Sequence, residues 1–357
     1  MPDKIISNSR GTALLITLAV ITLVIAVTLE INRQVRSSVT RSAAGTDRIK
    51  LIRIASSGIN AAQAILVKDR NKSDADSLLE DWADDRKVAK VLDDMPFENG
   101  SVTVNISDEL SRIQVNALVK YPETRSFNER QRIIWEQLIR YAKIQSDQFE
   151  DIDPDVIINS AKDWLDTGDD DAITGLSGAE SDYYMSLDSP YACKNGPFAH
   201  IDELALLKGF PMEFLHGSDR IPGIAAYLTV RGVFDPGDGK FDYPGRINLN
   251  TAEPAVIAAI LPWENKDQAL AIVDFRQLLI ETDNTAAFQT PLWYQQAPGC
   301  GNLKIDPALL TVSSDLFRIE STAALGEARL TVIALVRREN QKKTGRWVCK
   351  TLQWEIK

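Results

Sequence analysis

The chain has few of the residues on which most metal and catalytic sites depend. Its 357 residues include only two histidines, which disfavours histidine-rich metal sites and most histidine-based acid–base catalysis. There is no CxxC, so neither a zinc ribbon nor a thioredoxin-like site is expected. The three cysteines, Cys193, Cys300 and Cys349, allow at most one internal disulfide, whose pairing the sequence leaves open. No GxSxG, HExxH or P-loop motif supplies an enzymatic nucleophile, metal or phosphate site.

An excess of positive charge is also missing. The chain has 40 Lys+Arg against 50 Asp+Glu, a formal net charge of -10, whereas a nucleic-acid backbone is bound by clustered basic residues. The apolar fraction of 44% and charged fraction of 25% are ordinary for a globular protein and exclude bulk disorder. The length is sufficient for more than one domain core.

One long apolar segment lies near the beginning of the chain. Residues 12–29 carry no charged side chain and would span about 27 Å as a helix, close to the thickness of a hydrocarbon core. No secretory cleavage motif follows, which favours an uncleaved anchor over a signal peptide. Both flanks carry Lys or Arg, so the orientation stays open. Helical periodicity without proline then continues, predicting one helix from Thr12 to about Arg70, roughly 88 Å long.

Alternating sequence patterns predict strands on both sides of a helical block. Residues 101–106 and 112–118 are expected to form a hairpin, and residues 328–337 and 346–356 are expected to pair with each other. The helical segments between them include an amphipathic helix at 128–143. If both groups of strands belong to one sheet, the helical block is an insertion into an α+β head.

The helical block contains an internal repetition. RIQVNA at 112–117 is echoed by RINLNTA at 246–252, and each introduces a run of helices. This predicts two helical subdomains joined near 221–236, with chance similarity as the alternative. Residues 248–276 also resemble a helix-hairpin-helix unit. Pro262 is followed there by Trp-Glu-Asn-Lys and no glycine allows close approach to a phosphate, so we expect a packing unit and no nucleic-acid partner.

The acidity of the chain is concentrated in residues 146–188, which contain thirteen acidic residues and one lysine. Carboxylates at this density repel one another unless a cation lies among them. A flexible loop rich in oxygen ligands is what calcium prefers. The loop is not an EF-hand, because Ile173 and Thr174 stand where that motif needs a ligand and a glycine. The alternative is a solvated acidic loop without an ion.

The beginning of the chain resembles the type IV pilin and pseudopilin superfamily. The resemblance lies in a short leader that ends Arg10-Gly11, followed by Thr12-Ala-Leu-Leu and the long apolar helix. It implies that a prepilin peptidase cleaves between Gly11 and Thr12. The family usually has glutamate at the fifth mature position, where this chain has Ile16. Because that acid is thought to pair with a neighbouring subunit, its absence suits a unique position such as a filament tip. A plain membrane anchor is the alternative.

Later motifs resemble the K-type minor pseudopilins of type II secretion, the general secretion pathway protein K family. They are DWLD at 163–166, GAE at 178–180, YY at 183–184, PY at 190–191, NGPF at 195–198 and DEL at 202–204. The resemblance implies an α+β fold in which a pilin-like long N-terminal helix packs on an antiparallel sheet. It also implies a large inserted α-helical domain built of two SAM-like or helix-hairpin-helix-like subdomains.

The same resemblance implies a division of the chain into six parts. They are a leader (1–11), a transmembrane part of the helix (12–30), the first part of the head (31–118), a first inserted subdomain with the acidic loop (119–235), a second inserted subdomain (236–310) and the C-terminal strands of the head (311–357).

The function implied by the resemblance is structural and not enzymatic. Such a protein caps the pseudopilus tip and initiates or limits pseudopilus assembly for protein export across the outer membrane. The implied calcium ligands are Asp166, Asp169, Asp171, Glu180 and Asp182, with Asp163 and Asp170 as further candidates. A minor pilin of a type IV or DNA-uptake pilus and a membrane-anchored periplasmic enzyme are the alternatives.

The resemblance also implies partners and a location. The implied partners are the I- and J-type minor pseudopilins, the major pseudopilin, a prepilin peptidase that also methylates the new amino terminus, and the inner-membrane assembly platform. The implied location is the bacterial inner membrane, crossed once, with the C-terminal head in the periplasm.

Overall fold

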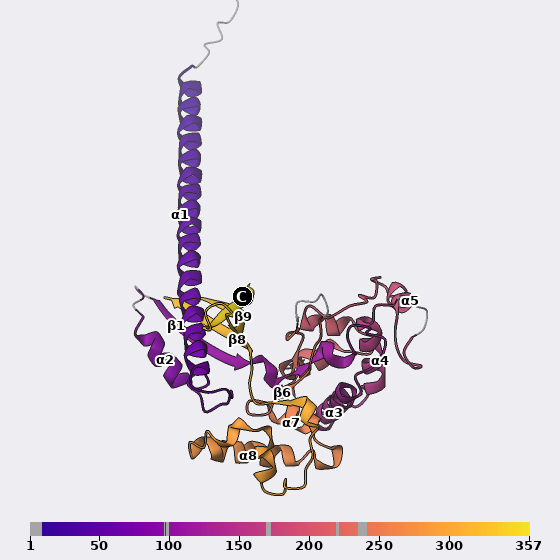
Figure 1. The fold of residues 1–357 in the computed structure, drawn as a ribbon. Coiled ribbons are helices and arrows are strands. Elements are labelled where there is room, and N and C mark those ends of the chain that lie inside the picture. The colour runs from indigo at the N-terminus through magenta and orange to yellow at the C-terminus, as the bar shows by residue number, and fades with distance from the viewer. Residues whose placement is uncertain (1–8, 96, 98–99, 169–172, 219–220, 235–240) are drawn as a thin grey trace, which may run out of the picture.

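The computed structural model describes the chain apart from residues 1–8, 96, 98–99, 169–172, 219–220 and 235–240. One long helix rises from a small sheet, and a larger group of short helices lies beside and below that sheet (Figure 1). The helices are α1 (Ser9–Arg70), α2 (Asp85–Asp93), α3 (Glu129–Gln145), α4 (Pro154–Leu165), α5 (Ser181–Met185), α6 (Met212–His216), α7 (Pro254–Ile260) and α8 (Gln268–Glu281). The strands are β1 (Gly100–Asp108), β2 (Ile113–Gln114), β3 (Gly217–Ser218), β4 (Ile221–Pro222), β5 (Leu228–Thr229), β6 (Ile247–Asn248), β7 (Leu310–Thr311), β8 (Leu316–Leu325), β9 (Ala328–Asn340) and β10 (Trp347–Ile356).

Helix α1 ends at Arg70, where the helical periodicity predicted that it would end. Its first part is exposed on all sides, and it is long and apolar enough to cross a membrane. From Leu51 onward one face is buried against the sheet. Gly58 lies at the closest point of this contact, because a Cβ there would stand 2.4 Å from Ser321 Oγ and 2.8 Å from Val104 Cγ2. Glycine therefore lets the helix approach the strands.

The head is a four-stranded antiparallel sheet in the order β1-β8-β9-β10. The pairing of β9 with β10 is confirmed. The predicted hairpin of 101–106 with 112–118 is wrong. Strand β1 pairs with β8 along its whole length, from Gly100 opposite Leu325 to Asp108 opposite Phe317. The two groups of strands thus form one sheet, and everything between β1 and β8 is an insertion.

The inserted domain has a hydrophobic core of its own, separate from the core between α1 and the sheet. Strand β2 pairs in parallel with β5 at the start and end of its first subdomain, and β6 pairs in parallel with β7 in the second. The sequence repetition between 112–117 and 246–252 therefore corresponds to a repeated construction. The first subdomain begins at β2, inside the segment 31–118 that was assigned to the head.

Two asparagines show how closely the two subdomains correspond. Asn116 and Asn250 follow β2 and β6, and both are fully buried. The amide of Asn116 donates to the carbonyl oxygen of Val230, the residue after β5, at 3.1 Å. The amide of Asn250 donates to the carbonyl oxygen of Val312, the residue after β7, at 3.4 Å. Each buried amide thus fastens the end of its subdomain to the beginning, which satisfies polar groups that burial would otherwise leave unpaired.

The three cysteines, Cys193, Cys300 and Cys349, are all free thiols in this structure. Cys193 and Cys300 are buried in the inserted domain, whereas Cys349 lies on β10 beside the core of the head.

Candidate metal site

The acidic loop begins at the carboxyl end of α4. Asp153 caps the amino end of that helix by accepting a hydrogen bond from the Asp155 amide, and Pro154 occupies its first position. The apolar side chains of α4 pack into the inserted core. Asp163 and Asp166 follow three residues apart in the last turn and the C-cap. This helical spacing places the two side chains next to each other.

The carboxylate of Asp163 organises the loop that follows α4. Its side chain is fully buried, and the Thr174 amide lies 3.1 Å from each of its oxygens. The Ala179 amide donates to Oδ2 at 2.9 Å. Gly178 is required between these donors, since a Cβ there would stand 2.1 Å from Asp163 Oδ2. The chain on both sides of Gly178 therefore wraps around one buried carboxylate.

Three carboxylates meet at this point. Asp163, Asp166 and Glu180 each offer one oxygen, and these oxygens lie within 4.8 Å of one another. All three residues are buried, with 0%, 6% and 4% of their surface exposed. Lys162 Nζ lies 2.7 Å from Asp166 Oδ2 and 3.9 Å from Asp163 Oδ1. Burial raises the pKa of Asp163.

The chemistry of this group fits a hard cation. Oxygens that contact one calcium ion at 2.3–2.6 Å lie at most about 5 Å apart, which the spacing of the three carboxylates allows. Cys193 lies against Asp163, but burial raises the pKa of its thiol to about 12, so a thiolate ligand for a soft metal is disfavoured. Asp163, Asp166 and Glu180 would hold the ion, and Lys162 would compete with it for Asp166.

Aromatic side chains on both sides of the loop pack together in the inserted core. Trp164 meets Tyr184 edge to face at a centroid distance of 5.4 Å and stacks on Phe198 at 6.1 Å. On the other side of the loop, Lys208 Nζ donates to the carbonyl oxygen of Gly178 at 3.2 Å. The three carboxylates are therefore held by a rigid frame, which favours a defined site over a solvated loop.

The structure brings together only some of the predicted ligands. Asp166 and Glu180 meet at the site, and Asp163, a further candidate in the sequence, lies at its centre. Asp182 is exposed in the first turn of α5 and is not among the three clustered carboxylates. Asp169 and Asp171 lie outside the described residues, as does Asp170.

The residues expected to matter for processing and assembly lie on the exposed part of α1. Gly11 and Thr12 are both exposed, and the position of a Gly11 Cβ is surrounded by open space. The side chain of Ile16 is 64% exposed.

The unit that resembles a helix-hairpin-helix is formed by α7 and α8. Arg276 on α8 points into the protein, where its Nη1 donates to the carbonyl oxygens of Leu249 and Ala252 at 3.2 and 2.7 Å. Burial lowers the pKa of this arginine to about 10. Its guanidinium ties α8 to the chain before α7, so this basic residue serves packing.

A second group of acids was not suggested by the sequence. Asp69, Asp76 and Glu80 also bring one oxygen each within 4.8 Å of the others. Their main partner, Arg338, lies more than 250 residues further along the chain. No local pattern marks such a contact.

A model of a known protein family matches part of the inserted domain. Residues 111–217, which contain the first subdomain up to α6, match the family model described as Type II secretion system (T2SS), protein K. The whole fold is similar to a chain of the GspK-GspI-GspJ complex from the type 2 secretion system of enterotoxigenic Escherichia coli. That similarity has a TM-score of 0.61 and 16% sequence identity, and it covers 89% of this chain and 99% of the other. No curated protein sequence matches the chain.

The fold defines the class of protein. A long N-terminal helix packed on an antiparallel sheet, with a helical domain inserted between β1 and β8, is a pilin-like α+β fold with a helical insert. The family model matches the part of the chain that contains the first inserted subdomain, and the structural match extends the similarity to the fold of nearly the whole chain.

Proposed function

We propose that this chain is a minor pseudopilin of the protein K type that caps the tip of a type II secretion pseudopilus and initiates or limits its assembly. The main support is the insertion between β1 and β8, which adds a second core beside the sheet (Figure 1). Filament subunits stack along their long helices, so a domain that widens the head opposes the addition of a subunit above it. Ile16 at the position of the usual glutamate gives further support, since pairing with a preceding subunit is not required at a tip.

The proposed partners and location follow from the same assignment. The I- and J-type minor pseudopilins are the direct partners, because the similar chain comes from a complex with proteins of those two types. The major pseudopilin, the prepilin peptidase and the inner-membrane assembly platform act on or beside the chain during assembly. Helix α1 crosses the inner membrane once and the head lies in the periplasm.

Processing and assembly can be tested in one co-expression experiment. With the peptidase present, the wild-type chain should lose residues 1–11 and co-purify with the I- and J-type proteins, whereas Gly11→Ala should stay at precursor length. Gly45→Ala is the matched control, because Gly45 is also exposed on α1 with open space around its Cβ position. Normal cleavage of Gly11→Ala would contradict the processing site. Failure of the cleaved wild-type chain to co-purify would contradict the assembly role.

We also propose that Asp163, Asp166 and Glu180 bind calcium, with further ligands from the acidic residues around them. The support is the convergence of three buried carboxylates, each with one oxygen within 4.8 Å of the others. Calcium would neutralise this charge and fasten the loop to α4. Its role is structural, because it would hold the first inserted subdomain in the shape that partners contact.

The calcium proposal is tested by melting the full chain in detergent with calcium and with a chelator. An ion that binds only the folded state stabilises by mass action, about 2.7 kcal/mol at a concentration one hundred times its Kd. Asp166→Ala with Glu180→Ala should clearly reduce the calcium-dependent rise in melting temperature. Asp182→Ala, which removes an exposed acid outside the cluster, should retain most of it. An unchanged rise in the double variant would place the ion elsewhere.

A further inference from the structure

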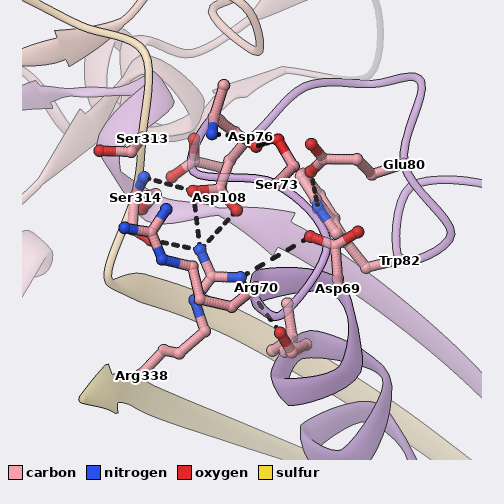
Figure 2. A network of polar contacts seen from close by, with 12 residues as sticks. Asp69, Arg70, Ser73, Asp76, Glu80, Trp82, Asp108, Ser313, Ser314 and Arg338 are labelled. Atoms are coloured by element: carbon pink, nitrogen blue, oxygen red, sulfur yellow. Dashed lines mark hydrogen bonds and ion pairs between the residues drawn. The ribbon is translucent and has the colours of Figure 1, made fainter. Parts of the chain in front are cut away.

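The second group of buried carboxylates lies where α1 meets the loop that follows it (Figure 2). Asp69 belongs to the last turn of α1, and Asp76 and Glu80 belong to the loop before α2. Asp69 and Asp76 are 4% and 1% exposed, and Glu80 is partly buried. The group is far from the acidic loop in sequence and lies against the core of the head, not that of the first inserted subdomain.

One arginine neutralises only part of this charge. Arg338 on β9 is 2% exposed, and its Nη2 lies 2.5 and 2.7 Å from the two carboxylate oxygens of Asp76. The Ser314 amide donates to Asp76 Oδ2 at 2.8 Å, and Arg338 also donates to the carbonyl oxygens of Leu66 and Ser314. Asp76 is therefore fully bonded, and the charge of Arg338 is directed mainly toward it.

Asp69 and Glu80 are less well satisfied. Asp69 Oδ2 is buried and accepts no hydrogen bond within the described chain, and its ion pair with Arg338 Nη1 is long, at 3.7 Å. Glu80 receives both of its protein donors, the Ser77 amide at 3.2 Å and Trp82 Nε1 at 2.8 Å, on the single oxygen Oε2. A buried carboxylate oxygen without a donor, such as Asp69 Oδ2, is costly, and the neighbouring carboxylate of Glu80 repels it as well.

A cavity of about 300 Å³ opens beside these two carboxylates. Its lining includes Asp69 and Glu80 together with the polar side chains of Ser73 and Ser77. The site is therefore polar and large enough for ordered water. Magnesium is commonly bound by one or two carboxylates that leave several of its waters in place, and calcium also accepts water among its oxygen ligands.

We propose that Asp69 and Glu80 hold a hydrated divalent cation, calcium or magnesium, in this cavity, with Asp76 at its edge. Arg338 offsets part of the negative charge of the three carboxylates, and Lys72, which also lines the cavity, is paired with Asp81 at 3.0 Å, so a divalent ion would offset more of that charge. The amides of Asn248 and Asn250 in the second inserted subdomain donate to the carbonyl oxygen of Asp76. The cation would therefore join the end of α1 to the head and to the inserted domain.

A shared proton is the competing way to relieve the repulsion. Burial and the neighbouring Asp69 raise the pKa of Glu80 to about 9, and burial raises the pKa of Asp69 to about 6. An acid whose pKa is raised on folding stabilises the protein at low pH and loses that contribution as the pH rises. The shared-proton explanation and the bound-cation explanation therefore predict different changes in protein stability with pH and with added metal.

The test uses the full chain in detergent with Asp163→Asn and Asp166→Asn as background, so that the first cluster does not contribute. Terbium serves as the probe, because it is a hard cation whose emission is sensitised by a nearby tryptophan. Trp82 is 2% exposed and hydrogen-bonded to Glu80, so it is positioned to sensitise the ion. We expect bright terbium emission, displaced by calcium or magnesium, and at least tenfold weaker binding when Asp69→Asn and Glu80→Gln are added.

Two further variants distinguish loss of the ion from misfolding of the protein. Trp82→Phe should lose most of the sensitised emission while the calcium-dependent rise in melting temperature remains. Asp81→Asn should retain terbium binding, because Asp81 lines the same cavity but is already paired with Lys72 and Lys87 at 3.0 and 2.9 Å.

Three results would overturn the cation proposal. The first is the absence of terbium binding in the background variant, and the second is binding that the Asp69 and Glu80 changes leave unaltered. The third is a stability that falls between pH 6 and pH 9 and that neither calcium nor magnesium restores, which would assign the cluster to a shared proton.

Discussion

The geometry around Asp163 shows how one residue can depend on the absence of a side chain at another. The carboxylate accepts amide hydrogens from Thr174 and Ala179, and these donors can reach it only because the chain between them passes without a Cβ at Gly178. The hydrogen bonds to a buried charge are among the stronger ones in proteins, about 1.5–3 kcal/mol each. The hydrogen bonds to Asp163 therefore depend on glycine at position 178.

We predict that Gly178→Ala destabilises the inserted domain and weakens calcium binding. A methyl group 2.1 Å from Asp163 Oδ2 and 2.8 Å from the Thr174 backbone must displace one of them, at a cost of about 1–3 kcal/mol. Gly196→Ala is the control, because the nearest atom to its Cβ position is 3.9 Å away. Urea unfolding with and without calcium measures both effects. Equal stability of the two variants would show that the loop does not wrap Asp163 as described.

At this scale the family resemblance named two of the three carboxylates that meet, Asp166 and Glu180, among its implied ligands. It did not distinguish Asp163 as the centre, because full burial depends on how α4 packs. It gave no sign of Asp69 with Glu80, since isolated acids in a polar loop resemble ordinary surface residues.

At the scale of whole elements, the contact between α1 and the sheet depends on glycine. Gly58 would be a weak point in an isolated helix, where glycine costs roughly 0.5–1 kcal/mol relative to alanine. Here the missing Cβ leaves room for Ser321 and Val104. The buried face of α1 gains more from this close packing than the helix loses in propensity.

The same substitution at two glycines of α1 should therefore have opposite effects. Gly58→Ala should lower the free energy of unfolding by about 1–3 kcal/mol, because the added methyl group meets Ser321 Oγ at 2.4 Å. Gly45→Ala should be neutral or stabilising, because nothing lies within 4 Å of its Cβ position and helix propensity improves. Denaturant unfolding in detergent compares them. A Gly58→Ala variant as stable as Gly45→Ala would contradict the tight contact.

Prediction of the elements succeeded where the pattern is local and failed where the partner is distant. The end of α1 and the pairing of β9 with β10 follow from periodicity and from strands that are neighbours in the chain. Strand β1 was assigned a sequential partner, but its true partner β8 follows more than 200 residues later. The intervening domain closes on itself through β2 with β5 and β6 with β7, so β1 and β8 leave it close together.

At the scale of the whole molecule, the insertion widens the head beyond its sheet. The sheet and α1 form one core, and the helical domain forms another that extends to the side (Figure 1). Polar contacts near Asp76 join the two, since this residue binds Arg338 of the head and its carbonyl oxygen accepts from Asn250 of the insertion. The wide head is therefore braced, which a cap that ends a filament requires.

The position of the chain along the filament provides the last prediction. If the widened head prevents further stacking, each pseudopilus should carry this subunit at one end only. An epitope tag after Lys357, which is exposed, should place gold particles at single filament ends in electron micrographs. The same tag on the major pseudopilin is the control and should label filaments along their length. Gold distributed along the filament from the tagged chain would show that the inserted domain does not block stacking, and the capping role would then be wrong.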